Sequence, residues 1–254
     1  FFDKKENINY IDIGASDVKN KILYFNYNFI NFFLFEPDKR AIKGYLSSPK
    51  VGNFKLFDKG LWSKKTKKMF YEYKNQASSS FFKANINKLK NYNIGTEIYK
   101  LQKKYISELD NLDNLLKKKY QIDFIKIDTE GSDLEILKGS KETLKENLGI
   151  IIESQFIERY LGTKSFSEIE IFLRSYGYEI FSLNLEKWPQ SKKYNIESNI
   201  KSVWADVLYF ISLEKFLLRL EKTRNNKNRL LLTKKIIFLM TLYKMHDSAI
   251  RYLF

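Results

Sequence analysis

Seven short hydrophobic runs along the chain end in small, polar or acidic residues. They cover residues 9–13, 31–35, 53–57, 123–127, 149–152, 178–181 and 204–210. Strands that are buried on both faces of a parallel sheet read as near-continuous apolar runs of this kind. The pattern therefore predicts seven strands, most of them in one parallel sheet.

Helical segments separate many of these runs. Residues 132–138 carry Leu134 and Leu137 at helical spacing and stop at Gly139, a residue typical of a helix C-cap. Further helices are predicted over 140–146 and 165–175. Strands that alternate with helices indicate right-handed crossovers and an open, doubly wound α/β sheet. Because no strong helix separates the last two strands, we expect them to form an antiparallel hairpin at the sheet edge.

Two regions do not follow this alternation. Residues 64–105 are polar and aromatic, and we expect a hairpin and loops over one sheet end. The serines at 78–80 are suitable for a substrate-facing loop, but a solvated turn is the favoured interpretation. Residues 213–254 are expected to form two helices that separate around Asn225 and Asn226. The sequence thus predicts one domain over 1–212 and a basic helical C-terminal extension over 213–254.

The composition excludes several kinds of site. The chain has no cysteine and one histidine, His246, which excludes disulfides, thiolate catalysis, cysteine-ligated zinc and histidine-centred triads. The net charge is +15, but lysine and asparagine are plentiful throughout, as codon bias in an AT-rich genome would produce. No run of about 18 apolar residues is present, and we expect a cytoplasmic protein.

The charge is concentrated near the C-terminus, where residues 214–254 hold ten Lys or Arg against three Asp or Glu. We interpret this first as the solvated faces of helices that pack on the core. Peripheral contact of these helices with an anionic membrane is a second interpretation.

Carboxylates follow several of the predicted strands. They are Glu36, Asp58, Asp128, Glu130 and Glu153. In an open parallel sheet, ligands bind beyond the carboxyl ends of the strands, where the strand order reverses. The sequence therefore predicts a binding site at this edge.

Gly14 follows the first strand directly. A glycine there lets the backbone approach a ligand, and a helix N-terminus after it offers N–H donors to an anion. Glu36 ends the second strand, where a carboxylate can accept hydrogen bonds from both ribose hydroxyls of an adenosine cofactor, and Pro37 stops the strand. The chain lacks the further glycines of a pyrophosphate loop, which disfavours a nicotinamide cofactor.

Ordered motifs add a family resemblance to this pattern. They are Ile-Asp-Ile-Gly-Ala at 11–15, Phe-Glu-Pro at 35–37, Gly-Leu-Trp-Ser at 60–63, Ala-Ser-Ser-Ser at 77–80, Leu-Asp at 109–110, Ile-Lys-Ile-Asp-Thr-Glu-Gly at 125–131 and Leu-Lys-Gly at 137–139. Between about residues 9 and 210 the chain resembles the FkbM family of methyltransferases. The resemblance implies a Rossmann-like class I methyltransferase fold, S-adenosylmethionine as methyl donor, and O-methylation of a sugar, glycan or secondary metabolite.

The resemblance also implies roles for single residues. Asp12 and Gly14 would flank the methionine part of the cofactor, together with Ala15 and Ser16, and Glu36 would bind the ribose beside Pro37. Asp58, Leu61 and Trp62 would lie near the adenine, and Asp128 and Glu130 beside the reacting centre. The family usually has asparagine and a further glycine where this chain has Ser16-Asp17-Val18, and Asp17 would repel a cofactor carboxylate unless it points away.

Asp128 and Glu130 are the candidate catalytic residues, with Glu153 third. Methyl transfer needs chiefly alignment, but a hydroxyl acceptor must also lose its proton to a base. For Glu130 a cofactor-orienting or helix-capping role is an equal interpretation, and for Asp128 an orienting role is favoured. The three carboxylates are also suitable ligands for Mg²⁺, but nothing in their spacing requires a metal, and we predict none.

Two alternatives to a hydroxyl acceptor remain. The charge favours a nucleic-acid methyltransferase, but such enzymes commonly carry an Asn/Asp-Pro-Pro-aromatic turn where this chain has Asp-Thr-Glu-Gly at 128–131, so we do not expect a nucleic-acid partner. The other alternative is a degenerate methyltransferase fold that binds a partner without catalysis. We expect specificity for the small-molecule or glycan acceptor to come from residues 64–105 and 188–201.

Overall fold

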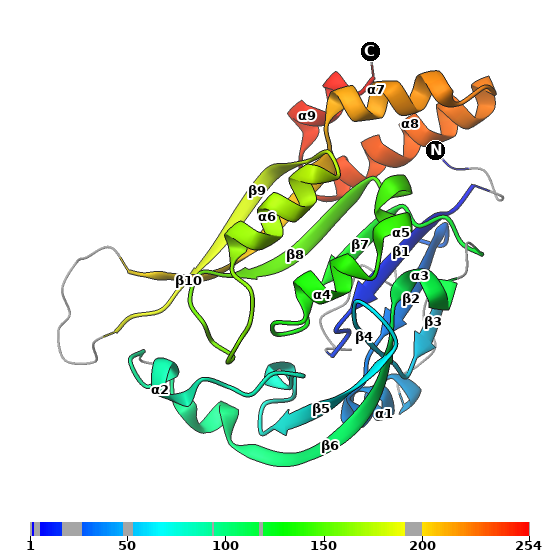
Figure 1. Cartoon of the computed structure of the whole chain (residues 1–254). Coiled ribbons are helices and arrows are strands. Elements are labelled where there is room, and N and C mark those ends of the chain that lie inside the picture. Colours follow the sequence, from blue (N-terminus) through cyan, green and yellow to red (C-terminus); the bar gives the residue numbers. More distant parts are fainter. Residues whose placement is uncertain are drawn as a thin grey trace.

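The computed structural model describes residues 2, 6–16, 27–47, 53–92, 94–116, 119–190 and 200–253. Within these ranges a seven-stranded sheet has the order β3-β2-β1-β7-β8-β10-β9 (Figure 1). Its strands are β1 (Ile8–Ile13), β2 (Ile30–Phe35), β3 (Asn53–Phe57), β7 (Phe124–Ile127), β8 (Gly149–Gln155), β9 (Tyr178–Lys187) and β10 (Ser202–Ile211). The pairs from β3 to β8 are parallel, whereas β10 is antiparallel to both β8 and β9. The predicted strands, the final hairpin and the Rossmann-like fold class are confirmed.

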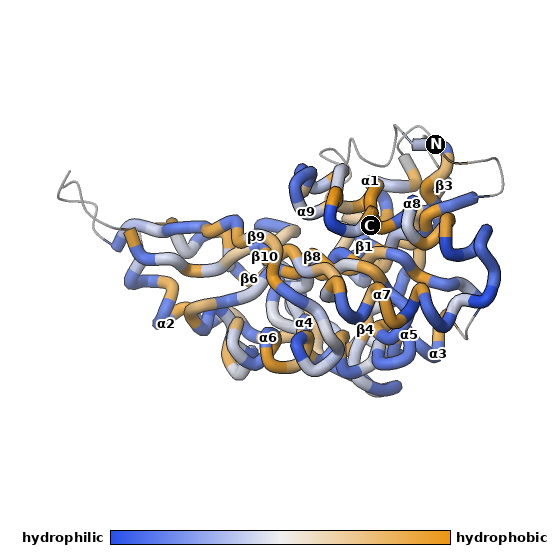
Figure 2. Tube along the Cα trace, turned by 90° about the horizontal axis from the view of Figure 1, so that it is seen from above, coloured by the Kyte–Doolittle hydropathy of each residue, from blue (hydrophilic) through white to orange (hydrophobic). Residues whose placement is uncertain are grey.

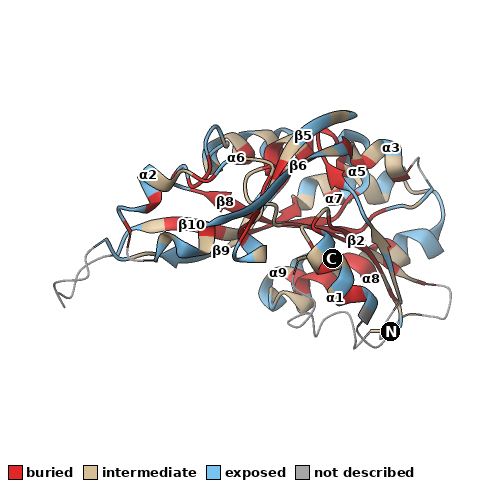
Figure 3. Cartoon of the chain, turned by 90° about the horizontal axis from the view of Figure 1, so that it is seen from below, coloured by how far each residue is buried: buried red, intermediate tan, exposed pale blue. Residues whose placement is uncertain are grey.

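Helices cover both faces of this sheet (Figure 3). One face carries α1 (Lys39–Ser47), α8 (Asn226–Leu242) and α9 (His246–Arg251), and the other carries α3 (Leu112–Leu116), α4 (Asp133–Lys138), α5 (Lys141–Glu146) and α6 (Phe166–Ser175). The three helices predicted between the strands are thus α4, α5 and α6. Ser165 and Glu168 form a capping box at the start of α6, which satisfies backbone N–H groups there.

The core consists of the central strands, whose side chains are buried on both faces, as the apolar runs predicted. Ile11, Ile125 and Ile150 are fully buried in three adjacent strands. Seen from above, the hydrophobic residues continue through the region of β1 and β8 (Figure 2). β9 is longer than predicted because its second half pairs with β10 away from the core, where Leu183 and Leu185 remain exposed.

A second sheet lies across the carboxyl ends of the first (Figure 1). It contains β4 (Gly60–Leu61), β5 (Thr66–Tyr73) and β6 (Leu101–Asp110) in the order β4-β6-β5. β5 and β6 form the predicted hairpin, and the segment between them contains the short helices η2 (Gln76–Ser78), α2 (Ile86–Leu89) and η3 (Thr96–Tyr99). The prediction of a solvated serine turn is wrong, because Ser78 and Ser80 are buried.

Three helices, not two, follow β10 in the described part of the C-terminal segment. They are α7 (Leu213–Lys222), α8 and α9, and Asn225 caps α8 at the predicted break. A turn at Lys244, with a φ of 61°, then ends α8 and admits α9. The predicted packing on the core is confirmed, since Ile236 and Leu239 are fully buried in the main hydrophobic cluster.

Polar contacts also attach these helices to the sheet. The Tyr243 hydroxyl lies 2.8 Å from that of Tyr10, and the Lys235 ammonium donates to the Asp123 carboxylate at 2.8 Å. Leu217, Leu218 and Leu230 stay exposed. No helix in the described ranges combines the length and apolar composition needed to cross a membrane.

Candidate active site

A cleft lies at the carboxyl edge of the main sheet, lined in part by the β5–β6 hairpin. It opens at the reversal of strand order between β1 and β7, where the sheet topology predicts a ligand site. The structure brings seven of the eleven predicted site residues into its lining: Gly14, Ser16, Glu36, Pro37, Leu61, Asp128 and Glu130.

The other four predicted residues lie outside the lining. Asp12 and Ala15 are fully buried beneath it. Asp58 follows β3 as an exposed residue. Trp62 is buried against the rings of Phe81 and Phe82, so it supports the cleft wall from behind.

Gly14 is held tightly between β2 and β7. Its φ is +81°, and a Cβ placed on it would lie 1.8 Å from the Asp128 carbonyl oxygen, so a larger residue does not fit. The N–H groups of Gly14 and Ala15 donate to the Phe35 carbonyl, and that of Ser16 donates to Gly14. Backbone donors for an anion must therefore come from beyond Ser16. Asp17 lies outside the described residues.

Glu36 supplies a buried carboxylate to the cleft wall. The residue is 3% exposed, and its Oε1 accepts a hydrogen bond of 2.7 Å from the Asp38 N–H. This bond fixes the carboxylate at the start of α1, so the local turn that resembles a helix cap also aims the acid into the cleft. Carboxylate oxygens in this position suit ribose hydroxyls.

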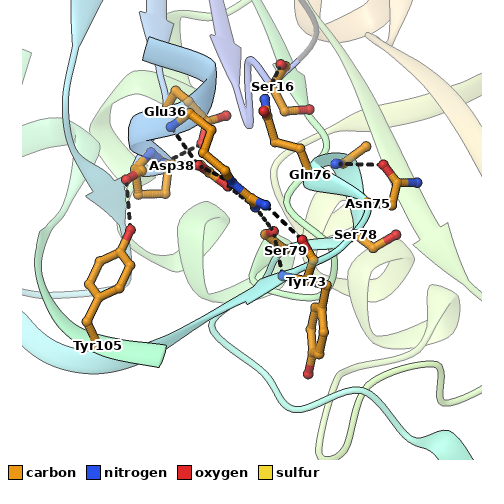
Figure 4. Close-up of polar contacts among 12 residues, drawn as sticks. Ser16, Glu36, Asp38, Tyr73, Asn75, Gln76, Ser78, Ser79 and Tyr105 are labelled. Atoms are coloured by element: carbon orange, nitrogen blue, oxygen red, sulfur yellow. Dashed lines mark hydrogen bonds and ion pairs between the residues drawn. The ribbon is translucent and has the colours of Figure 1, made fainter. Parts of the chain in front are cut away.

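Arg40 ties this turn to the β5–β6 hairpin (Figure 4). Its guanidinium binds Asp38 and donates to the Tyr73 carbonyl and the Ser79 hydroxyl, each at 2.8 Å. The Tyr105 hydroxyl donates to the Pro37 carbonyl at 3.3 Å. Nearby, the Gln76 side chain donates to the Ser16 carbonyl at 2.8 Å. The hairpin is thereby attached to the loops that follow both β1 and β2.

Apolar side chains form much of the cleft wall. They are Ile13, Phe35, Leu61, Phe70, Phe81 and Ile136. An apolar wall beside a fixed carboxylate suits an adenosine, whose base is flat and whose ribose carries two hydroxyls. The residues present therefore fit the cofactor that the family resemblance implies.

Asp128 has a half-buried cation beside it. Lys126 lies two residues before Asp128 on the same face of the sheet. Its ammonium donates to the Asp128 carboxylate at 2.9 Å and lies 3.9 Å from the Asp12 carboxylate. Although burial lowers the pKa of Lys126, the charges of Asp128 and Asp12 raise it above its ordinary value, so it stays ionised.

Glu130 lies at the turn after β7 in a left-handed conformation, with a φ of 55°. The Ser80 hydroxyl donates to its carbonyl at 2.8 Å, and the Asp133 carboxylate accepts from the N–H groups of Thr129 and Gly131. These bonds hold a conformation that costs a non-glycine residue energy. Such strain is common where a side chain must be aimed at a functional site.

A buried arginine joins Glu130 to Glu153. Arg159 donates to Glu130 at 2.8 Å and also contacts the Glu153 carboxylate. Burial raises the pKa of Glu130 to about 7, against the attraction of Arg159, and it raises the pKa of Glu153 well above its ordinary value. No pattern in the sequence indicates Arg159, because a single arginine in a loop looks like any surface arginine.

Asp128, Glu130 and Glu153 are the three carboxylates that the sequence presents as suitable ligands for Mg²⁺. Carboxylate oxygens of Asp128, Glu130 and Glu153 all lie within 4.8 Å of one another. The Arg159 guanidinium contacts two of the three and balances part of their charge.

Comparisons with known proteins give a match to one family. A family model described as the Methyltransferase FkbM domain matches residues 12–180. A search of the curated proteins finds no match.

Several solved structures are similar in outline, at low sequence identity. Precorrin-6y C5,15-methyltransferase from Geobacter metallireducens is 13% identical, with a TM-score of 0.41 over 82% of this chain and 81% of its own. TehB from Haemophilus influenzae is 12% identical, with a TM-score of 0.39 over 82% and 59%. A SAM-dependent methyltransferase from Anabaena variabilis is 8% identical, with a TM-score of 0.36 over 82% and 78%.

Proposed function

Because the chain belongs to the FkbM family of S-adenosylmethionine-dependent methyltransferases, we propose that it methylates a hydroxyl group of a sugar, a glycan or a secondary metabolite. The observation that carries this proposal is Glu130, a carboxylate beside the cofactor cleft whose pKa is raised by burial to about 7. A base with such a pKa is ionised in part at neutral pH and can accept a proton from an alcohol.

For the cofactor, the protein must hold the molecule in position and complement its positive charge. S-adenosylmethionine supplies its methyl group from a positively charged sulfonium. Glu36 would accept hydrogen bonds from the ribose hydroxyls, the apolar wall would hold the adenine, and Asp128 would add negative charge to the part of the cleft that the positively charged end of the cofactor enters. The β5–β6 hairpin covers the cleft and limits the access of water, which favours the in-line approach of the acceptor.

The hydroxyl acceptor must lose its proton during the reaction. As the acceptor oxygen forms its bond to the methyl carbon and the carbon–sulfur bond breaks, the hydroxyl proton passes to the Glu130 carboxylate. A base positioned in this way contributes about 10²- to 10⁴-fold to a rate. Glu130→Gln, which keeps the shape of the side chain, is expected to lose a factor in this range.

Two measurements test the proposal. Calorimetry with S-adenosylmethionine should show binding that Glu36→Ala weakens about 10- to 100-fold, since a lost hydrogen bond to a buried charged group costs about 1.5–3 kcal/mol. Asp58→Ala is the matched control, because it removes an exposed carboxylate outside the cleft lining, and binding should not change. Absence of binding would instead support a degenerate fold.

The acceptor is sought by mass spectrometry. The protein is incubated with S-adenosylmethionine and panels of sugars, glycans, polyols and RNA, and the products are searched for the gain of one methyl group. Methylation confined to hydroxyl compounds supports the proposal. Methylation of base nitrogens in RNA, or none with any panel despite cofactor binding, refutes it.

A further inference from the structure

The Arg159 side chain occupies an unusual environment for an arginine. It is 4% exposed and lies between the Glu130 and Glu153 carboxylates, which are 12% and 7% exposed. Although burial lowers the pKa of Arg159, the two carboxylates raise it above its ordinary value, so the guanidinium stays charged. A buried charge of this kind is retained only where its partners are close and well oriented.

Aromatic rings restrict the guanidinium from the other directions. Its central carbon lies 5.7–5.8 Å from the ring centroids of Tyr160, Trp188 and Trp204. At such distances a guanidinium is attracted to the ring faces. Tyr160 is the next residue along the chain, whereas Trp188 and Trp204 come from the β9–β10 hairpin, so residues distant in sequence also enclose Arg159.

The loop that carries Arg159 is itself fixed to the segment between β5 and α2. The Asn85 N–H donates to the Arg159 carbonyl at 2.8 Å, and the Tyr160 hydroxyl donates to the Ser78 carbonyl at the same distance. The guanidinium thus has a defined position relative to the cleft.

Each acid at the end of β7 has its own cation. Lys126 forms an ion pair with Asp128, and Arg159 forms ion pairs with both Glu130 and Glu153. Three carboxylates within 4.8 Å of one another would repel strongly without such cations. We propose that Arg159 is a positioning residue that holds Glu130 toward the methyl-transfer cleft. Its guanidinium is the resident cation of this carboxylate cluster and occupies the place that a bound divalent cation would otherwise take. The inference rests on the proposed function for the role of Glu130.

Mn²⁺ alone tests the resident-cation part, with binding followed by electron paramagnetic resonance. Arg159→Met removes the guanidinium and leaves the carboxylates, so it should bind Mn²⁺ at least tenfold more tightly than the wild-type protein. The double variant Glu130→Gln with Arg159→Met should lose that gain. Equal or weaker Mn²⁺ binding by Arg159→Met than by the wild-type protein would overturn the inference.

Methyl transfer to the acceptor found in the screen tests the positioning part. Arg159→Met should lose at least tenfold in kcat while the KM for S-adenosylmethionine changes less than twofold, and Arg159→Lys should recover much of the loss. Millimolar methylguanidinium should restore activity to Arg159→Ala. A similar loss in the lysine variant together with failure of this rescue would overturn the positioning role.

A matched control separates these effects from general damage. Arg174→Ala removes an exposed arginine that pairs with Glu170 on α6, and it should neither lose activity nor respond to methylguanidinium. The proposed function and the inference about Arg159 can be refuted separately. An empty acceptor screen refutes the proposed function, whereas the Mn²⁺ measurement still reports on the cluster.

Discussion

Lys235 on α8 and Asp123 before β7 form a buried ion pair, and its loss is expected to be costly. The Lys235 ammonium donates at 2.8 Å to an Asp123 carboxylate that is fully buried and also accepts from the Asn9 N–H at 2.9 Å. Lys235→Met keeps the bulk of the side chain but leaves the carboxylate without its cation. Breaking a buried pair from one side costs about 3–5 kcal/mol, which for a chain of this length lowers Tm by roughly 6–20 °C.

The pH dependence of this loss follows from the pKa of Asp123. Burial raises that pKa, and Lys235 opposes the rise. Without Lys235 the pKa rises further, so the variant binds a proton that the wild-type protein releases. The difference in stability should therefore be greatest above the pKa of Asp123 in the variant and should shrink as the pH falls and both proteins become protonated there.

Urea unfolding at several pH values measures this difference. Adding Asp123→Asn to Lys235→Met should recover most of the loss, because the amide keeps an acceptor for Asn9 and carries no charge. Lys227→Met, at an exposed position of the same helix, should change stability by no more than about 0.5 kcal/mol. A loss below about 1 kcal/mol for Lys235→Met, or one that acidification leaves unchanged, would refute the reasoning.

Three further predictions concern the cleft. In urea unfolding, Gly14→Ala should lower the free energy of unfolding by several times the roughly 1–2 kcal/mol that a positive φ alone costs, because its Cβ would lie 1.8 Å from the Asp128 carbonyl oxygen. Gly95→Ala is the control, because Gly95 has a φ of +70° but no described atom within 4 Å, and it should lose only that roughly 1–2 kcal/mol. Because burial raises the pKa of Glu130 to about 7, kcat/KM should rise about tenfold per pH unit below 7 and level off above it, and a pH-independent rate would contradict its role as base. Arg40→Met removes the bonds to Tyr73 and Ser79 that anchor the hairpin beside Glu36, and it should weaken S-adenosylmethionine binding about tenfold in calorimetry. That factor corresponds to about 1.4 kcal/mol, less than one charge-assisted hydrogen bond contributes. Unchanged affinity would show that the hairpin does not shape the cofactor wall.

Hydrophobic pattern alone was enough to predict the main sheet. The runs at the centre of the sheet, such as 31–35 and 149–152, are largely buried on both faces in the structure, so their continuous apolar character reports burial directly. The edge runs are only partly buried at residues 54–57 and 178–181. The three-stranded sheet was harder to predict, because β6 has long exposed stretches with a mixture of lysines, glutamate and isolated apolar residues. A strand of that kind does not differ in pattern from a loop.

The candidate site was predicted in part for a similar reason. Gly14, Glu36 and Asp128 follow buried strands, and parallel strands bring their carboxyl ends together at one edge. Arg40 and Arg159 act through partners far away in sequence, such as Ser79 or Glu130. Nothing local distinguishes a charge that is paired in this way from one that is solvated.

The three serines at 78–80 have a consequence for protein engineering. The Ser79 hydroxyl accepts from the Arg40 guanidinium, the Ser78 carbonyl accepts from the Tyr160 hydroxyl, and the Ser80 hydroxyl donates to the Glu130 carbonyl. One short stretch of backbone therefore links the two parts of the site that we propose for the cofactor and for the acceptor. A chimaera that exchanges the whole β5–β6 excursion to alter acceptor choice would also disturb cofactor affinity. Grafts limited to residues 82–100, with 76–81 kept so that Phe81 stays in the cleft lining, separate the two properties.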